Sequence, residues 1–259
     1  MSHHALAGAI AAASLTTVAL AGVERPAILG PEDVPLIPRE VLFGNPERAG
    51  LELSPDGRHV SYLAPVDGVL NVWVAPVDDL DAAWVVTSDA DRGIRQYFWA
   101  ENSENVIYLQ DRGGDENWRA YSVHVTSREE IDLTPMDGVQ ARITATDRDD
   151  PDHILISVND RSPQFHDTYR VNVRTGEREL VHENDGYVGT VVDNDMQVRM
   201  GVRMNADASM VYEVIGGPNA GAEVLAVPQV DSMTTGPAGF IGDSSTVYML
   251  DSRARDTRA

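Results

Sequence analysis

The sequence contains no cysteine and no lysine. Without cysteine there can be no disulfide, no thiolate metal site and no thiol nucleophile. Without lysine there can be no P-loop lysine and no catalytic Schiff base. All 20 basic residues are arginine, and 41 acidic residues bring the formal net charge to -21. Nucleic acids and anionic membrane surfaces both need clustered basic residues, so the composition argues against either as a partner.

An uncharged, alanine-rich run, Ala5–Ala21, lies near the N-terminus and ends in small residues at a signal-peptidase spacing. It is shorter than the roughly 20 residues of a membrane span. We therefore predict a signal peptide over residues 1–22 and a periplasmic or secreted protein. The alternatives are a wrongly chosen start codon or a disordered tail, and a cytoplasmic protein. Residues 23–44 are rich in proline and predict an extended lead-in.

A turn followed by an alternating strand recurs along the chain with a nearly constant period. Its anchor residues, spaced 46, 48, 44 and 49 residues apart, are Val60, Val106, Ile154, Val198 and Val247. A period of about 40–50 residues is typical of the blades of a β-propeller. The repeat therefore points to an architecture rather than to an individual site.

Each period contains four short β-rich runs separated by turn residues such as Pro55–Gly57. In the second to fourth repeats the runs are residues 96–100, 105–110, 120–125 and 129–133, then 141–145, 153–159, 167–173 and 177–182, then 188–192, 197–202, 210–215 and 223–227. No helical periodicity appears after residue 40. Four strands per repeat predict an all-β propeller, with a β-sandwich as the structural alternative.

The repeat count predicts an incomplete ring. Residues 45–259 hold about four and a half repeats at this period. We therefore expect a truncated propeller domain over residues 45–259, where a complete propeller would have seven or eight blades. Unpaired strand edges would then be exposed at the open end.

Several segments resemble the N-terminal propeller of the prolyl oligopeptidase (S9) family of serine peptidases, in its acylaminoacyl-peptidase-like branch. In chain order they are Ile37–Pro46, Leu53–Gly57, Tyr108–Trp118, Asn159–Asp167, Tyr169–Arg178 and Tyr248–Asp256. The Ser-Pro-Asp-Gly segment is common to many propellers, including TolB-like ones, whereas the segments that begin at Tyr108 and Asn159 are far more specific.

The resemblance implies a two-domain parent protein. In that family the propeller caps a C-terminal α/β-hydrolase domain, which carries a Ser-Asp-His triad and follows the propeller in sequence. The implied partners are this hydrolase domain and peptide substrates, and the implied role of the propeller is to admit short peptides and exclude folded proteins. No cofactor is implied.

The chain itself carries no recognisable catalytic constellation. A nucleophile elbow requires Gly-x-Ser-x-Gly, and no such segment occurs in the 259 residues. Four histidines, His59, His124, His153 and His182, fall in or beside predicted strands, where a structural role is expected. The acidic run Asp147–Asp152 lacks the glycine and distal glutamate of an EF-hand loop, which favours a solvated turn over a calcium site. We expect no catalytic residue and no metal in this chain.

The best candidates for substrate contact are Asp111, Arg112, Asp115 and Glu116, in a glycine-containing acidic loop. They would line a substrate tunnel or a domain interface, and turn geometry is the alternative explanation. Two other functions stay open. A free-standing TolB-like or WD40-like propeller would act as an interaction scaffold, and a propeller glycosidase would use Asp111, Asp115 and Glu116 as its carboxylates.

Overall fold

The computed structural model of the protein describes residues 36–44, 46–242 and 244–258, and it divides the chain into two units, Met1–Gly44 and Asn45–Ala259. The predicted signal peptide lies outside the described residues. In the first unit the described part contains one short helix, α1 (Arg39–Phe43). The Val41 amide donates to the Pro38 carbonyl at 3.0 Å and closes a single turn, so this part of the predicted extended lead-in is helical. Among the described residues, no helix is long and apolar enough to cross a membrane.

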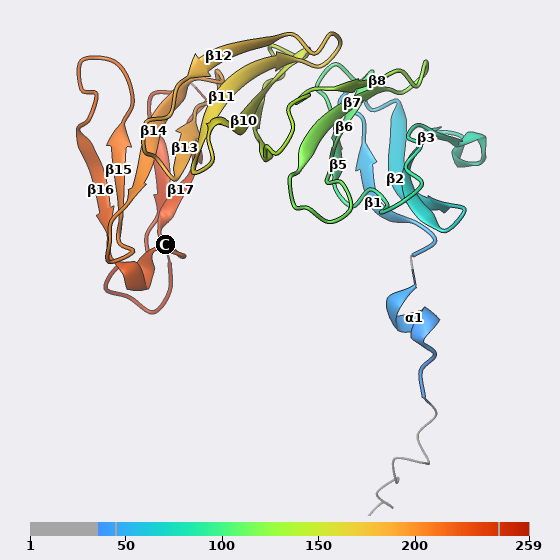
Figure 1. Ribbon diagram of the computed structural model, residues 1–259, viewed down its shortest axis with the longest axis horizontal. Helices are drawn as coiled ribbons and strands as arrows, with labels where there is room; N and C mark the ends of the chain where they lie inside the picture. The colour runs from blue at the N-terminus through green and yellow to red at the C-terminus, as the bar shows by residue number, and fades with distance from the viewer. Residues whose placement is uncertain (1–35, 45, 243, 259) are drawn as a thin grey trace, which may run out of the picture. The chain divides into compact units, whose positions relative to one another are not determined.

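The second unit is built from four four-stranded antiparallel sheets and one two-stranded sheet (Figure 1). In every four-stranded sheet the strands are hydrogen-bonded in chain order. The strands of the first two sheets are β1 (Ala49–Leu53), β2 (His59–Val66), β3 (Val69–Pro76) and β4 (Trp84–Val85), then β5 (Tyr97–Trp99), β6 (Asn105–Gln110), β7 (Arg119–His124) and β8 (Glu130–Asp132).

The third and fourth sheets repeat this order, and two short 3-10 helices lie between strands of the unit. The strands are β9 (Ala141–Thr146), β10 (His153–Ser162), β11 (Phe165–Asn172) and β12 (Arg178–His182), then β13 (Gly189–Val192), β14 (Val198–Met204), β15 (Met210–Val214) and β16 (Glu223–Val227). The two-stranded sheet consists of β17 (Gly236–Phe240) and β18 (Val247–Leu250), and the 3-10 helices are η2 (Leu80–Ala82) and η3 (Gln229–Asp231). Four-stranded sheets repeated in chain order are propeller blades, so the predicted fold class is confirmed.

Turn chemistry explains why each run of alternating residues stops where it does. Between β2 and β3, Asp67 and Gly68 both have positive φ, 50° and 87°, and Val66 pairs directly with Val69. This is a two-residue Asp-Gly hairpin, whose twist matches that of the strands it joins. The β1–β2 turn uses Gly57 in the same way, with φ 71° and its amide donating to Ser54 O at 2.8 Å.

The first three sheets share two apolar cores. One core joins the first and second sheets, and its members include Val72 and Val74 of β3 and Val106 of β6. A second core joins the second and third sheets, with Ile107 of β6 and Ile156 of β10 fully buried. Because the second sheet buries side chains in both cores, it depends on both of its neighbours for that burial.

Polar side chains also cross between sheets. The Tyr97 hydroxyl donates to the Gly50 carbonyl and to Ser61 Oγ, and the Trp99 indole N–H donates to the same Ser61 Oγ at 2.8 Å. These bonds link β5 to the first sheet. Ser61 is fully buried, so both aromatic side chains bring their polar atoms to one hydroxyl in the core.

The four tryptophans lie in the first two sheets or in the segment between β6 and β7. Trp73 is in β3, Trp84 in β4, Trp99 in β5, and Trp118 directly precedes β7. The Trp84 indole N–H donates to the Val125 carbonyl at 2.8 Å and so ties the first sheet to the second. Trp99 is buried in the first core, as expected for a packing residue.

Candidate functional site

The acidic loop between β6 and β7 is anchored by a buried carboxylate. Asp111 has a side chain that is 2% exposed, and its Oδ1 lies 3.0 Å from Arg92 Nε. Its Oδ2 accepts a hydrogen bond from the Glu116 amide at 3.3 Å. A Cβ added to Gly114, whose φ is 85°, would come within 2.9 Å of an Arg92 nitrogen. Asp111 therefore stabilises the loop through its buried contacts with Arg92 and the Glu116 amide, and it is not exposed to bind a ligand itself.

The outer part of the same loop is a turn built around Asp115. Its carboxylate accepts bonds from the Arg112 amide at 3.2 Å and the Asn117 amide at 3.0 Å. The hydrogen bond from the Asn117 amide, together with weaker ones, holds the pKa of Asp115 below its ordinary value. Arg112, Asp115 and Glu116 are all exposed. Their role in substrate contact stays a prediction, because these contacts explain the turn without a ligand.

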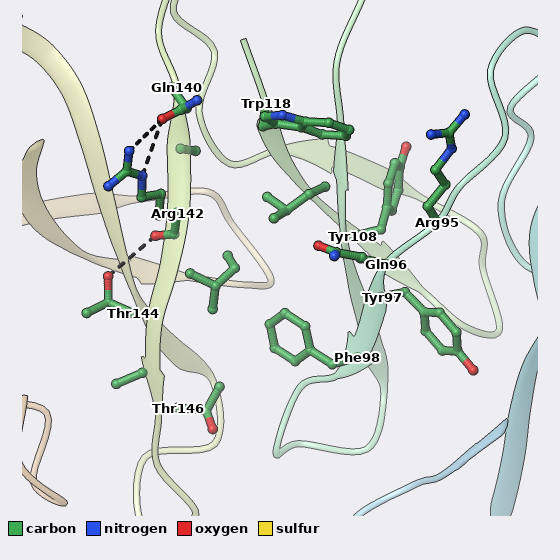
Figure 2. Close-up of a pocket in the computed structure, with 14 residues that line it drawn as sticks. Arg95, Gln96, Tyr97, Phe98, Tyr108, Trp118, Gln140, Arg142, Thr144 and Thr146 are labelled. Atoms are coloured by element: carbon green, nitrogen blue, oxygen red, sulfur yellow. Dashed lines mark hydrogen bonds between the residues drawn. The ribbon is translucent and has the colours of Figure 1, made fainter. Parts of the chain in front are cut away.

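Directly beside this loop lies a cavity of about 970 Å³ between the second and third sheets (Figure 2). Its apolar walls are Phe98 of β5, Leu109 of β6 and Ile143 of β9, and Trp118 lies across one end. The Ala141 amide donates to the Trp118 carbonyl at 2.7 Å, which fixes the start of β9 against the segment that enters β7. The volume is in the range of ligand-binding clefts.

The charged side chains at this cavity are two arginines, and its lining includes no aspartate and no glutamate. Arg95 is exposed and makes no hydrogen bond or ion pair with a described residue. Arg142 binds only a neutral partner, since its Nη2 and Nε donate to Gln140 Oε1 at 2.9 and 3.3 Å. In a chain of net charge -21, this surface is locally cationic.

A second cavity of about 290 Å³ is lined partly by the same strand, through Arg142, Ile143 and Thr144, and partly by side chains that precede or begin the fourth sheet. Thr144 Oγ1 and Ser157 Oγ share a hydrogen bond of 2.8 Å in its wall. His166 also lines it, and burial, followed by the nearby Arg142 guanidinium, lowers the pKa of His166 and keeps the ring neutral at pH 7.

The Asn-Asp-Arg segment near the end of β10, residues 159–161, supports this second cavity. Arg161 holds Asp167 through two hydrogen bonds of 2.8 and 3.0 Å and donates to the Asn184 carbonyl at 2.8 Å. Burial alone would raise the pKa of Asp167, but the Arg161 bonds and the Asn184 amide outweigh it and hold that pKa below its ordinary value. The network fixes Asn184, which lines the cavity.

Two carboxylates of the acidic run Asp147–Asp152 have structural partners. In the acidic run, Asp150 pairs with His153 and Arg170, and Asp152 accepts from Arg174 and Asn102. No group of three or more metal-ligating side chains gathers within residues 36–44, 46–242 and 244–258.

Sequence reasoning did not single out the residues that line the two cavities. Phe98 stands on β5, whereas Arg142 and Ile143 are neighbours on β9, and the two strands meet only through packing between sheets. The available signal was Trp118, a large aromatic residue placed directly after an exposed loop.

Comparison with known proteins gives two curated relatives, and no family model matches the chain. The chain is 40% identical over 225 residues to dipeptidyl aminopeptidase BIII of Pseudoxanthomonas mexicana, a match covering 86% of this chain and 33% of the relative. It is 29% identical over 235 residues to dipeptidyl peptidase family member 6 of Caenorhabditis elegans, covering 84% and 31%. The chain thus spans about a third of the length of the curated relatives it matches.

Among solved structures, one from a study of two prolyl endopeptidases matches with a TM-score of 0.52 at 14% identity, over 78% of this chain and 30% of that one. This likeness supports the fold. The sequence match to a dipeptidyl aminopeptidase of the prolyl oligopeptidase (S9) family confirms the relationship that the motifs indicate, and the chain is therefore a propeller related to those of the S9 peptidases.

Proposed function

We propose that this chain is the substrate-gating propeller portion of an S9-type serine peptidase that releases dipeptides from the N-termini of oligopeptides. The observation that carries the proposal is the 40% identity to dipeptidyl aminopeptidase BIII across 86% of the chain. Because the match covers a third of that protein, hydrolysis is assigned to a Ser-Asp-His triad in a C-terminal α/β-hydrolase domain and not to this chain. The names of both curated relatives favour dipeptide release over acylaminoacyl hydrolysis.

The physical basis of gating is the rigidity of the stacked sheets. The shared cores and the polar links through Ser61 hold neighbouring blades together, so the propeller resists the widening that a folded protein would require. An extended oligopeptide is thin enough to pass. The cavity at Phe98, Trp118 and Ile143 offers apolar surface to the side chains of such a peptide.

The test compares two proteins. The complete polypeptide, containing this propeller and the proposed hydrolase domain, should be labelled by a fluorophosphonate probe and should cleave dipeptidyl p-nitroanilides. The 259-residue chain alone should do neither, since it contains no Gly-x-Ser-x-Gly segment. A complete protein that resists the probe, or cleavage by the 259-residue chain alone, contradicts the proposal.

Export is part of the same proposal, with residues 1–22 as the signal peptide, residues 23–44 as the lead-in and residues 45–259 as the propeller domain. The support is the uncharged run Ala5–Ala21 with small residues at its end. The mature N-terminus, determined by mass spectrometry on periplasmic or secreted protein, should lie close to residue 23. Cytoplasmic protein that keeps its first residues would contradict export.

A further inference from the structure

We infer that strand β9 is a docking edge on which an extended peptide adds as a further strand, with its alternate side chains entering the two cavities that β9 separates. The expected peptide carries apolar or aromatic side chains on one face and carboxylates on the other. The inference deepens the proposed function, because it names how the propeller would hold an oligopeptide.

The first observation is that β9 ends its sheet. The strand order is β12-β11-β10-β9, so β9 pairs with β10 on one side and with no strand of the sheet on the other. The Ala141 amide is already bonded to the Trp118 carbonyl, and the Arg142 carbonyl accepts from Thr144 Oγ1 at 3.4 Å, so an added strand would use the edge from Ile143 to Thr146. A free edge presents unpaired N–H and C=O groups, which is what an added peptide strand uses.

The second observation is that the two cavities share β9. Arg142, Ile143 and Thr144 line both of them. Figure 2 shows Arg142 and Thr144 on one side of the strand, and Phe98 and Trp118 on the other. Side chains of a strand point alternately to opposite faces, so a peptide lying along β9 would direct alternate side chains toward the two cavities.

The third observation is the chemistry of the two cavities. On the larger side the lining combines the apolar side chains Phe98, Leu109 and Trp118 with the exposed Arg95. On the smaller side the lining is polar, and its single cationic group is Arg142, because His166 is neutral. Neither lining contains a carboxylate, although 41 of the 259 residues are acidic.

The charge pattern decides between an acidic and a basic peptide. The Arg142 guanidinium is satisfied by the neutral Gln140 amide alone, and Arg95 has no polar partner among the described residues. A guanidinium without a counter-ion gains most from a carboxylate, which it binds through charge-assisted hydrogen bonds. A basic peptide would meet like charge at the same position.

The test uses the 259-residue chain and a synthetic probe, the acetylated pentapeptide Phe-Glu-Phe-Glu-Phe with a fluorophore at its C-terminus. Blocking both ends removes terminal charges. Fluorescence anisotropy should show saturable binding, and the matched peptide with lysine in place of glutamate should bind at least about tenfold more weakly. Equal binding of the two peptides overturns the proposed charge preference.

Main-chain pairing is tested by two N-methylated probes, one methylated at the odd amides and the other at the even amides. Only every second N–H of an added strand faces its neighbour, so one of the two probes should lose binding and the other should keep it. If both retain the affinity of the parent peptide, no strand is added and the inference is wrong. These probes use the unaltered chain, so the result does not depend on a variant that folds.

The position of the site is tested by Arg142→Gln, which should weaken binding of the glutamate probe about tenfold. The matched control is Arg58→Gln, in the exposed turn before β2, which should leave binding unchanged. An unchanged affinity in Arg142→Gln, with native circular dichroism, overturns the assignment to β9. Sedimentation of the unliganded chain provides the last check, because a dimer that the peptide does not dissociate means that a second copy occupies the edge.

The peptide-binding experiment and the catalytic experiment test the two proposals independently. Absence of probe binding to the 259-residue chain would remove the docking edge and leave the S9 assignment intact. Absence of fluorophosphonate labelling of the complete protein would remove the peptidase assignment and leave the measured peptide binding intact.

Discussion

Arg161 and Asp167 form a bidentate ion pair in the third sheet, with both carboxylate oxygens of Asp167 bonded to the guanidinium at 2.8 and 3.0 Å. The Asp167 side chain is 2% exposed, whereas that of Arg161 is 42% exposed. Folding removes water from the Asp167 carboxylate, so the hydrogen bonds from its partners must replace the lost hydration. Both members of the pair also form hydrogen bonds with Asn184, which lines the smaller cavity. The pair therefore helps to fix the wall of that cavity.

Replacing the carboxylate should leave its partners unsatisfied. We expect Asp167→Ala to lower the free energy of unfolding by about 3 kcal/mol, because the buried Asn184 amide loses its acceptor and Arg161 loses two of its hydrogen bonds. Urea unfolding followed by circular dichroism measures the change. The control is Asp207→Ala, an exposed carboxylate in the turn between β14 and β15, which should stay within about 0.5 kcal/mol of the wild type.

The same carboxylate should make stability depend on acid pH. Because the folded pKa of Asp167 lies below its unfolded value, its contribution is complete above the unfolded pKa and is lost as the pH falls through the folded pKa. Wild-type protein should therefore lose more stability than Asp167→Asn when the pH is lowered from about 6 to about 3. Parallel losses in the two proteins would show that Asp167 does not report this protonation.

The hydroxyl of Tyr97 should contribute to the link between the first two sheets. Tyr97→Phe removes the donor to Gly50 O and Ser61 Oγ while keeping the ring in the core. We expect a loss of about 1 kcal/mol in the free energy of unfolding. Tyr248→Phe, whose side chain is 64% exposed, is the matched control and should have no measurable effect.

Gly201 in β14 should not tolerate a side chain. A Cβ at this position would lie 2.3 Å from Tyr187 Cδ1, so Gly201→Ala forces the ring out of its place over the strand. We expect a destabilisation of about 1–3 kcal/mol. The control, Gly189→Ala in the paired strand β13, has no atom within 4 Å of the added Cβ and should be nearly neutral.

The loop candidates can be separated by their burial. Asp115→Ala and Glu116→Ala, both at exposed positions, should change the free energy of unfolding by less than about 0.5 kcal/mol. Asp111→Ala should lower it by about 3 kcal/mol, because Arg92 loses its ion-pair partner. In the complete protein, a raised KM in the two exposed variants with unchanged stability would assign the loop to substrate contact. Unchanged KM values would leave it a structural turn.

The sequence predicts the strands well because their boundaries are set locally. The predicted run 105–110 is β6 and the predicted run 223–227 is β16, without a shift, since turn residues and alternation mark each end. The predicted run 153–159 falls three residues short of the end of β10, where the hairpin to β11 contains a register shift that alternation does not reveal.

The site was less accessible to sequence reasoning for the opposite reason. Phe98 and Ile143 line one cavity but stand 45 residues apart, and their meeting depends on how the second and third sheets pack. The acidic loop between β6 and β7 was predicted to contact substrate because of its unusual sequence. In the structure its most buried member, Asp111, supports the turn, and the loop leads into Trp118 at the cavity.

The placement of the four tryptophans has a practical consequence for studies of how the blades unfold. Because all of them precede or lie within the second sheet, tryptophan emission reports on the first two sheets, and the later sheets do not contribute to that signal. Far-ultraviolet circular dichroism reports on the backbone of every sheet. An emission change that comes before the loss of circular dichroism would mean that the first two blades separate while the others are still folded, and coincident curves would mean that the blades unfold together.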